Sequence, residues 1–502
     1  MGLGRISETD AANAGRKIRR GSVRRLDAVI KKTGGGYPEA QNGNGPLAIL
    51  GGGPGGLSVA YYAAKRGIPF TVYEAGSRVG GNCVTFQHGD FLFDSGAHRF
   101  HDKDPEITGE LQRLLGDALK TVDVPSKIYD NGRLVSFPLL PLDLARHLGF
   151  VAMCRAGLEV LGSRLGRRRD ERTFEDLSVG RYGRTIARRF LLGYSEKLWG
   201  RSCAELSPTI AGRRLGGLNL WTFLTESLRS SASNSRHLEG RFWYPRLGIE
   251  TISRRLAESF EPHRIATDST VTGVAHDGRR VEAVEINGRM WVHAGQVVST
   301  LPLGTLVRLM RPSPPRRILE LSDVLTYRSL VLAALFVNVP SVTRAATVYF
   351  PGRDFLFTRV YEPKNRCPQM SPADRTSLVA EIPCRSGDAL WSLDDDQIVG
   401  QVRSQLVDIG WIRPEQVIGS AVTRLNHAYP VLTLEAERAV PEIADYLAGF
   451  ANLTLAGRNG RFVYASIHDV LRSGREIVGR LEARQGRHNP PVGEIRRDSC
   501  AG

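Results

Sequence analysis

Glycines near residue 50 have a spacing that could bind phosphate groups through the backbone. Gly51, Gly53 and Gly56 form a GxGxxG pattern that follows one apolar segment and opens a second segment of small residues, with Gly55 inside the same turn. The first glycine permits a tight turn, the second lets the backbone approach a pyrophosphate, and the third lets a helix pack closely on a strand. The N-terminus of that helix would stabilise the phosphate charge. The spacing therefore predicts a dinucleotide site.

An acidic residue and a second glycine turn follow the first turn at the expected distance. Glu74 ends the next apolar segment, where a carboxylate accepts hydrogen bonds from the adenosine ribose. Arg78, Gly80 and Gly81 come directly after it. A second backbone approach with a cation suits FAD, which is longer than NAD. The alternative is a glycine-rich turn in an unrelated α/β unit.

A late segment, LTLAGR followed by a loop and a helical pattern, adds further candidates for cofactor binding. Gly457 and Arg458 could present a backbone and a guanidinium to the diphosphate. Asp469 precedes the last predicted helix, whose N-terminus could stabilise charge on a reduced flavin. An ion pair between helix and sheet is the alternative for Arg458, and a helix N-cap is the alternative for Asp469. Val271, on a predicted strand, completes the candidate set.

Four residues are candidates for holding a substrate. Arg359 and Lys364 could bind the anionic group of a phosphate-bearing molecule, although an exposed strand pair with Glu362 would explain them equally. Trp199 and Tyr327 could stack on a substrate ring, whereas packing in an aromatic core is the commoner role. The six cysteines have no metal-ligand spacing, so no metal site is predicted.

Several phrases resemble a known superfamily. GGGPGG at 51–56, Glu74, RVGGN at 78–82 and FDSGAHRF at 93–100 look like the FAD-binding start of the amine oxidase, protoporphyrinogen oxidase and phytoene desaturase superfamily. The resemblance runs from about Leu47 to Leu481. It implies a two-domain fold and non-covalently bound FAD.

Within that superfamily the chain is similar to UDP-galactopyranose mutases and to protoporphyrinogen-oxidase-like proteins. GAHRFH at 96–101 resembles the mutase loop that places a histidine beside the flavin, which implies that Gly96 contacts the cofactor and that His98 is a catalytic candidate. A lone histidine is otherwise more often structural. The further matching phrases are GYSEKLWG, YPRLG, LTYRSL, FTRVYEPKN, AYP and AGRNGRFVYASIHD. Two departures affect the substrate assignment: LSPTIAGRRLGGLNL follows the tryptophan phrase, and His468 replaces the usual Met or Gln.

The order of apolar segments predicts an α/β protein with a discontinuous, Rossmann-like FAD-binding domain and an inserted α+β substrate domain. Its length of 502 residues exceeds what one hydrophobic core supports. The expected boundaries are a disordered basic tail at 1–45, FAD-binding parts at 46–125, 236–304 and 421–485, a helical substrate part at 126–235, substrate strands at 305–420, and a flexible tail at 486–502.

The net charge of +16 does not by itself identify a partner. The arginines are spread along the chain and lack the spacing of a nucleic-acid reader, so no specific nucleic acid is expected. A phosphorylated or nucleotide-linked small-molecule substrate, or an anionic membrane surface, explains the charge. Residues 139–165 combine apolar residues with Arg146, Arg155 and Arg164, which fits either a peripheral membrane contact or core-facing helices. With no export segment and no transmembrane helix predicted, a cytoplasmic location is expected.

Two enzymatic hypotheses remain open. The leading one is an FAD-dependent oxidoreductase in which hydride passes from an organic substrate to the flavin. Its rival is a non-redox mutase in which reduced flavin attacks a sugar carbon and releases a nucleotide diphosphate. A flavin-bearing assembly or membrane-docking protein without catalysis is disfavoured, because so many motif residues are kept near the cofactor. The oligomeric state is not predicted.

Overall fold

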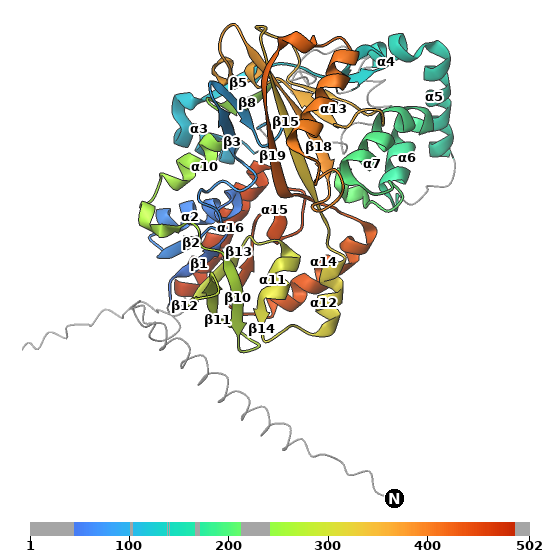
Figure 1. Ribbon diagram of the computed structural model, residues 1–502. Helices are drawn as coiled ribbons and strands as arrows, with labels where there is room; N and C mark the ends of the chain where they lie inside the picture. The colour runs from blue at the N-terminus through green and yellow to red at the C-terminus, as the bar shows by residue number, and fades with distance from the viewer. Residues whose placement is uncertain are drawn as a thin grey trace, which may run out of the picture.

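The computed structural model describes residues 45–100, 104–137, 139, 141–165, 171–211 and 241–486. The predicted tails at 1–45 and 486–502 lie outside these ranges except for residues 45 and 486, as do residues 212–235 of the predicted helical part. Figure 1 shows a lower half built around β1, β2 and β13, an upper half built around β15, β18 and β19, and a group of helices from α4 to α7 at one side.

A five-stranded parallel sheet is assembled from segments far apart in the sequence. Its order is β20-β13-β1-β2-β9. The strands are β1 (Leu47–Leu50), β2 (Phe70–Tyr73), β9 (Ile265–Ala266), β13 (Gln296–Ser299) and β20 (Leu453–Leu455). Helices α2 (Pro54–Lys65), α10 (Glu250–Ala257) and α16 (Ile467–Gly486) bury their apolar residues together with β1 and β2. The predicted discontinuous Rossmann-like unit is confirmed.

The other face of this sheet carries a second core. It is formed with a four-stranded sheet of order β12-β11-β10-β14 and with three helices. These elements are β10 (Val271–His276), β11 (Val281–Ile286), β12 (Met290–His293), β14 (Met310–Arg311), α11 (Leu303–Leu309), α12 (Arg316–Asp323) and α14 (Leu434–Ala448). Because α11 and α12 pack in this core, residues 305–325 lie with the Rossmann-like unit and not with the substrate strands to which the sequence prediction assigned them.

A seven-stranded mixed sheet forms the upper half, in the order β19-β15-β18-β17-β16-β6-β7. Its strands are β6 (Ser126–Asp130), β7 (Arg133–Phe137), β15 (Tyr327–Val337), β16 (Thr347–Tyr349), β17 (Arg359–Tyr361), β18 (Thr376–Cys384) and β19 (Val417–Pro430), and α13 (Asp395–Asp408) packs on it. Strand β19 crosses the predicted boundary at residue 421, and β6 and β7 precede the helices in the part predicted to be helical. An apolar strand pattern in the sequence shows where a strand runs but not which sheet it joins. This explains why the predicted domain boundaries differ from the observed ones.

Helices and short segments complete the described chain. The helical group comprises α4 (Pro141–Leu148), α5 (Phe150–Leu165), α6 (Phe174–Ile186), the π-helix η2 (Ala187–Leu192) and α7 (Gly193–Trp199). The remaining elements are β3 (Thr85–His88), β4 (Phe91–Asp94), α3 (Pro105–Leu115), η1 (Gly116–Ala118), β5 (Leu119–Asp123), η3 (Pro208–Ala211), β8 (Arg241–Pro245), η4 (Pro262–Arg264), η5 (Pro363–Asn365), η6 (Pro368–Met370), η7 (Pro414–Gln416) and α15 (Gly457–Gly460).

Candidate functional site

The first glycine turn has no room for side chains at two of its positions. Gly51 adopts a φ of +103°, and a β-carbon there would lie 2.3 Å from Oγ1 of Thr300. A β-carbon on Gly56 would lie 1.9 Å from the carbonyl oxygen of Gly51. These are the tight turn and the close helix packing that the GxGxxG spacing predicts.

Three glycine turns meet at the N-terminus of α2. A β-carbon on Gly81 would lie 3.1 Å from Cα of Gly53, and one on Gly55 would lie 2.8 Å from Cα of Gly457. The turns that follow β1, β2 and β20 therefore approach one another through bare backbone. Gly53 is the N-cap of α2, and no side chain caps this helix. Its first N–H groups can thus bind a phosphate, so the residues present fit the pyrophosphate of a dinucleotide.

Glu74 and the second turn hold this backbone in place. Oε2 of Glu74 accepts a hydrogen bond from the backbone N–H of Gly52 at 2.7 Å, and the N–H of Gly80 donates to the carbonyl oxygen of Gly52 at 2.9 Å. Arg78 is exposed, with Nη1 3.4 Å from Oε2 of Glu250 and its guanidinium 5.2 Å from the centroid of the Phe86 ring. Glu74 stands at the end of β2 as predicted, and its carboxylate already orients the phosphate turn.

His98 lies in the loop that follows β4, three residues after Ser95. Its Nε2 is 3.1 Å from the hydroxyl oxygen of Ser95. Burial, together with the Arg458 and Arg359 guanidiniums, lowers the pKa of His98 to about 3. The imidazole is therefore neutral at physiological pH, and it can orient a partner by hydrogen bonding but not as a cation.

Arg359 forms a buried ion pair beside this loop. Its guanidinium lies 2.5 Å from Oε2 of Glu381 and donates to the hydroxyl of Tyr429 at 2.8 Å. The other carboxylate oxygen of Glu381 accepts from the backbone N–H of Ala97, next to His98, at 2.5 Å. Burial lowers the pKa of Arg359, but Glu381 and the neighbouring tyrosines outweigh burial and raise that pKa well above its usual value. Arg359 is permanently charged and fixed in orientation.

Aromatic rings and a second guanidinium complete a group that we call the aromatic–arginine cluster: Trp199, Arg359, Tyr429, Arg458 and Tyr464. The Trp199 ring meets the Tyr429 and Tyr464 rings edge-on, at centroid distances of 5.9 and 6.0 Å. The Arg458 guanidinium lies 5.4 and 5.3 Å from the centroids of the same two rings, and Nη1 donates to the carbonyl oxygen of Ala428 at 3.0 Å. The cluster joins α7, β17, β19 and the segment after β20 in one place.

Arg458 lies beside two aromatic rings, and its contact with the diphosphate stays a prediction. Its guanidinium faces the two tyrosine rings, while the neighbouring Gly457 lies at the glycine turns. Among the described residues no carboxylate forms an ion pair with Arg458, so the alternative prediction of an ion pair is not observed. Next to it, Oδ1 of Asn459 is buried and has no hydrogen-bond partner in the described chain, which leaves an acceptor for a hydroxyl of the cofactor.

Three further candidates make structural contacts. The hydroxyl of Tyr327 accepts from the backbone N–H of Leu303 and donates to the carbonyl oxygen of Asn459, both at 3.1 Å. Oδ2 of Asp469 accepts from the backbone N–H and the hydroxyl of Ser466, so Asp469 occupies the third position of α16 and supports the residue before the helix instead of being the N-cap itself. Val271, the first residue of β10, is buried in the second core.

Lys364 does not join the aromatic–arginine cluster through its ammonium group. Its Nζ donates to four backbone carbonyl oxygens, those of Pro340, Pro372, Ala373 and Arg375, at 2.7–3.0 Å. An ammonium group has three protons, so these acceptors fully occupy it. We therefore do not propose Lys364 as an anion binder, and this prediction is replaced by a role in holding the surrounding loop.

Glu381, Tyr429 and Tyr464 were missed by the sequence analysis as individual site residues. Tyr429 stands in the phrase AYP and Tyr464 in AGRNGRFVYASIHD, so two of them could have been chosen from the resemblance. Glu381 lies in the strand β18 and becomes a site residue through its pairing with Arg359 of β17. No local sequence signal distinguishes it.

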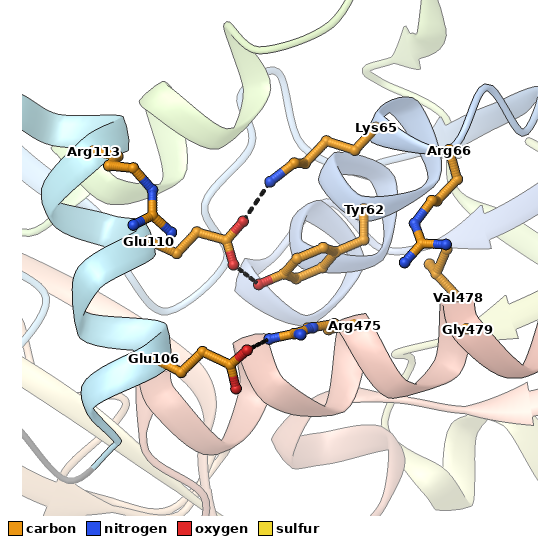
Figure 2. Close-up of a pocket in the computed structure, with 9 residues that line it drawn as sticks. All are labelled: Tyr62, Lys65, Arg66, Glu106, Glu110, Arg113, Arg475, Val478 and Gly479. Atoms are coloured by element: carbon orange, nitrogen blue, oxygen red, sulfur yellow. Dashed lines mark hydrogen bonds and ion pairs between the residues drawn. The ribbon is translucent and has the colours of Figure 1, made fainter.

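A cavity of about 260 Å³ lies away from these residues, between α2, α3 and α16. Figure 2 shows charged side chains facing one another across it. Oε1 of Glu110 is 2.6 Å from Nζ of Lys65, and Oε2 accepts from the Tyr62 hydroxyl at 2.5 Å, while Glu106 pairs with Arg475. Because opposite charges are paired here, the cavity is better explained as a polar contact between three helices than as a reaction site.

Comparisons with known proteins agree with the fold. Protoporphyrinogen oxidase 2 of Arabidopsis thaliana is 32% identical over 101 residues, which is 20% of this chain and 20% of that protein. Protoporphyrinogen oxidase 1 of the same plant is 29% identical over 171 residues, 32% of each chain. The matched region thus spans between a fifth and a third of these relatives.

Solved structures match over a much larger share of the chain. Reduced UDP-galactopyranose mutase superposes with a TM-score of 0.77 at 17% identity, covering 88% of this chain and 94% of that one. A putrescine oxidase bound to putrescine superposes with a TM-score of 0.60 at 18% identity, covering 88% and 99%. At these identities the likeness establishes the fold alone.

Among the described residues no helix is long and apolar enough to cross a membrane, and no group of three or more His, Cys, Asp or Glu could hold a metal ion. The family described as flavin containing amine oxidoreductase matches residues 54–481, which is most of the chain. The chain belongs to this family, and its cofactor is a flavin.

Proposed function

We propose that this protein is an FAD-dependent oxidoreductase whose organic substrate is held against the aromatic–arginine cluster. The observation that carries the proposal is the meeting of Arg359, Arg458 and three aromatic rings beside the loop of His98. FAD, when bound, supplies the acceptor for a hydride from the substrate. The protein supplies orientation and electrostatics, and no side chain of the cluster is arranged as a strong base.

The charges around His98 favour a neutral or anionic substrate over a protonated amine. Burial is the largest cause of the lowered pKa of His98, and the charges of Arg458, Arg359 and Arg366 lower that pKa further by adding a positive potential at the imidazole. The same potential would repel a cationic amine and attract a carboxylate or phosphate. A phosphorylated or nucleotide-linked substrate fits this environment.

Each polar residue has a distinct task in this proposal. Glu381 fixes Arg359, so that the guanidinium does not have to reorganise when an anionic group arrives. The Tyr429 hydroxyl accepts from Arg359, and its own proton is left to donate to the substrate. Burial raises the pKa of the Tyr429 hydroxyl, although Arg359 opposes that shift, so the phenol keeps its proton. Neutral His98 offers a further hydrogen bond.

Flavin bleaching under anaerobic conditions tests the proposal. Purified protein is mixed with matched pairs of candidate substrates that differ only in carrying a carboxylate, a phosphate or an amine, and the loss of flavin absorbance is followed. We expect bleaching by anionic or neutral members, and a fall of about tenfold or more in kcat/KM for the anionic members in Arg458→Gln. Arg316→Gln, at a guanidinium 91% exposed, is the matched control and is expected to behave as wild type. Bleaching by amines alone would refute the proposal.

A second candidate function is a non-redox mutase acting on a nucleotide sugar. Two guanidiniums beside aromatic rings would suit a diphosphate, and the fold superposes on that of UDP-galactopyranose mutase. Prereduced protein that interconverts a nucleotide sugar without net consumption of reductant would establish the mutase and exclude the oxidoreductase proposal.

A further inference from the structure

Six large apolar side chains are exposed at one end of the molecule, on α5 and on β7, and we call them the apolar patch. They are Phe150 (81% exposed), Val151 (81%), Leu158 (69%), Leu161 (47%), Leu134 (46%) and Phe137 (40%). Elsewhere among the described residues, only two large apolar side chains are comparably exposed, Leu247 and Ile418. Such clustering is unusual on a surface that faces only water.

Helix α5 is apolar on both of its faces. Its inner face buries Ala156 and Val160 in a small core shared with α4 and α6. Its outer face presents Phe150, Leu158 and Leu161, whose spacing brings them to one side of a helix. Figure 1 shows α5 at the outer edge of the molecule, with α6 between it and the rest of the chain. An amphipathic helix would need no cover on that side, whereas a helix that is apolar all round is ordinarily buried.

The patch is bordered by basic residues. The described stretches 144–165 and 171–172 contain four arginines and two acidic residues. Arg146 is exposed on α4, and Arg155, whose side chain is 75% exposed, lies on α5 and is paired with Glu159 at 3.3 Å. Apolar side chains with arginines around them match the boundary between acyl chains and anionic headgroups.

The same charge argues against a second copy of this chain as the cover. A two-fold interface places identical patches face to face, which would bring the arginines of one copy toward those of the other. Like charges across an interface cost affinity. An anionic lipid surface avoids this repulsion between like charges, and each arginine adds a favourable electrostatic interaction with it.

We propose that the apolar patch docks on the surface of an anionic membrane. The large side chains of α5 enter the acyl boundary, and the arginines contact the headgroups. No helix of the described chain is able to cross a bilayer, so the attachment is peripheral.

The patch is also connected to the aromatic–arginine cluster by a row of rings. Phe137 of the patch lies 4.8 Å from Tyr349, and Tyr349 lies 5.7 Å from Tyr194 on α7, centroid to centroid. Tyr349 pairs directly with Arg359 between β16 and β17. Docking would therefore set one wall of the cluster beside the bilayer, but the docking proposal concerns attachment and does not depend on which reaction the protein catalyses.

Sedimentation with vesicles tests the docking. The full chain, loaded with FAD, is mixed with vesicles of phosphatidylcholine alone or of phosphatidylcholine with phosphatidylserine. We expect binding to the serine-lipid vesicles that weakens as salt is added. In the combined variant Phe150→Ser, Val151→Ser and Leu158→Ser, we expect the partition coefficient to fall by about a hundredfold or more. In Arg146→Gln we expect a fall of about fivefold.

Matched controls separate docking from loss of structure and from the basic tail. The combined variant Leu247→Ser and Ile418→Ser removes exposed apolar side chains outside the patch and is expected to bind vesicles as wild type does. All variants should retain FAD and melt at the same temperature. The proposal is overturned if the wild type stays in the supernatant with both vesicle types, if the patch variant sediments like the control, or if the patch substitutions convert a dimer into a monomer in size-exclusion chromatography.

Discussion

Replacing Gly53 separates the binding of FAD from the stability of the fold. A β-carbon at Gly53 would meet only Cα of Gly81, at 3.8 Å, which is an ordinary van der Waals contact. Its φ of −71° suits any L-residue. The protein itself therefore tolerates a side chain here, and the N-cap position of α2 loses only about 0.5 kcal/mol of folding free energy. The space that a larger side chain would fill is the space assigned to the pyrophosphate.

Gly56 is the matched comparison in the same turn. A β-carbon there would lie 1.9 Å from the carbonyl oxygen of Gly51, so the backbone of α2 or of the turn must move. Forced overpacking of this kind costs about 1–3 kcal/mol, which adds to the loss of the cofactor. Gly53→Val should thus fold without FAD, whereas Gly56→Val should lose stability as apoprotein too.

Two measurements on the apoproteins and on the loaded proteins check this difference. We expect the affinity of Gly53→Val for FAD to fall by about a hundredfold or more, equivalent to about 2.7 kcal/mol, in a titration followed by flavin fluorescence. We expect urea unfolding of apo Gly53→Val to match the wild-type apoprotein within about 0.5 kcal/mol. A yellow Gly53→Val protein with one FAD per chain would refute the reasoning, as would equal destabilisation of the two apo variants.

Three further predictions concern charged and titratable residues. Glu381→Gln leaves the buried guanidinium of Arg359 without its carboxylate partner. We expect the free energy of unfolding, measured in urea, to fall by about 3–5 kcal/mol. The control Glu320→Gln, on the surface, should lower it by less than about 1 kcal/mol. Burial opposes ionisation of Glu110, but Lys65 and Tyr62 outweigh it and lower the Glu110 pKa. Its contribution to stability is therefore present above the unfolded carboxyl pKa of about 4.3 and is lost as the pH falls through the lower folded value. The stability difference between wild type and Glu110→Gln should shrink over that range, and a constant difference would contradict the assignment. Because the pKa of His98 is about 3, the rate of flavin reduction in His98→Gln should be lower at every pH between about 5 and 8 without a change in the shape of the profile. If the wild-type profile has an inflection near the ordinary histidine pKa and His98→Gln lacks it, the imidazole of His98 does titrate in that range and the assignment is contradicted.

The glycine turns could be predicted because their requirement is local. Gly51 needs a positive φ and Gly56 needs close packing on the preceding strand, and both demands are visible in the spacing of residues next to one another. Such local features are encoded by neighbouring residues, so sequence reasoning recovers them. The order of apolar segments also predicted a discontinuous Rossmann-like unit, but not which strands pair with β1 in its sheet.

The partners of the charged side chains could not be predicted from spacing. Arg359 pairs with Glu381 only because β17 and β18 are in register, and the two residues are 22 positions apart. The hydroxyl of Tyr327 donates a hydrogen bond to the carbonyl oxygen of Asn459, 132 positions away in the sequence. Arg458 was expected at the diphosphate because it follows Gly457, but spacing did not predict that its guanidinium lies beside the ring of Tyr429, which belongs to another strand.

The role of α5 illustrates a different limit. Its apolar and basic pattern left a membrane face and a core-facing helix as alternatives, and the structure buries apolar side chains on one face of the helix and exposes others on the opposite face. Ala156 and Val160 are buried, while Phe150 and Leu158 are exposed. A sequence pattern shows that apolar residues are present, but only the placement of α6 shows which of them are covered.

The number of FAD molecules bound per chain tests most directly whether the turns after β1, β2 and β20 hold a single flavin. The protein is purified, its visible spectrum is recorded, and the flavin released by denaturation is separated from the chain and quantified. The account predicts one FAD per chain, released completely because it is not covalently attached. A folded chain that is colourless and takes up no added FAD would contradict it.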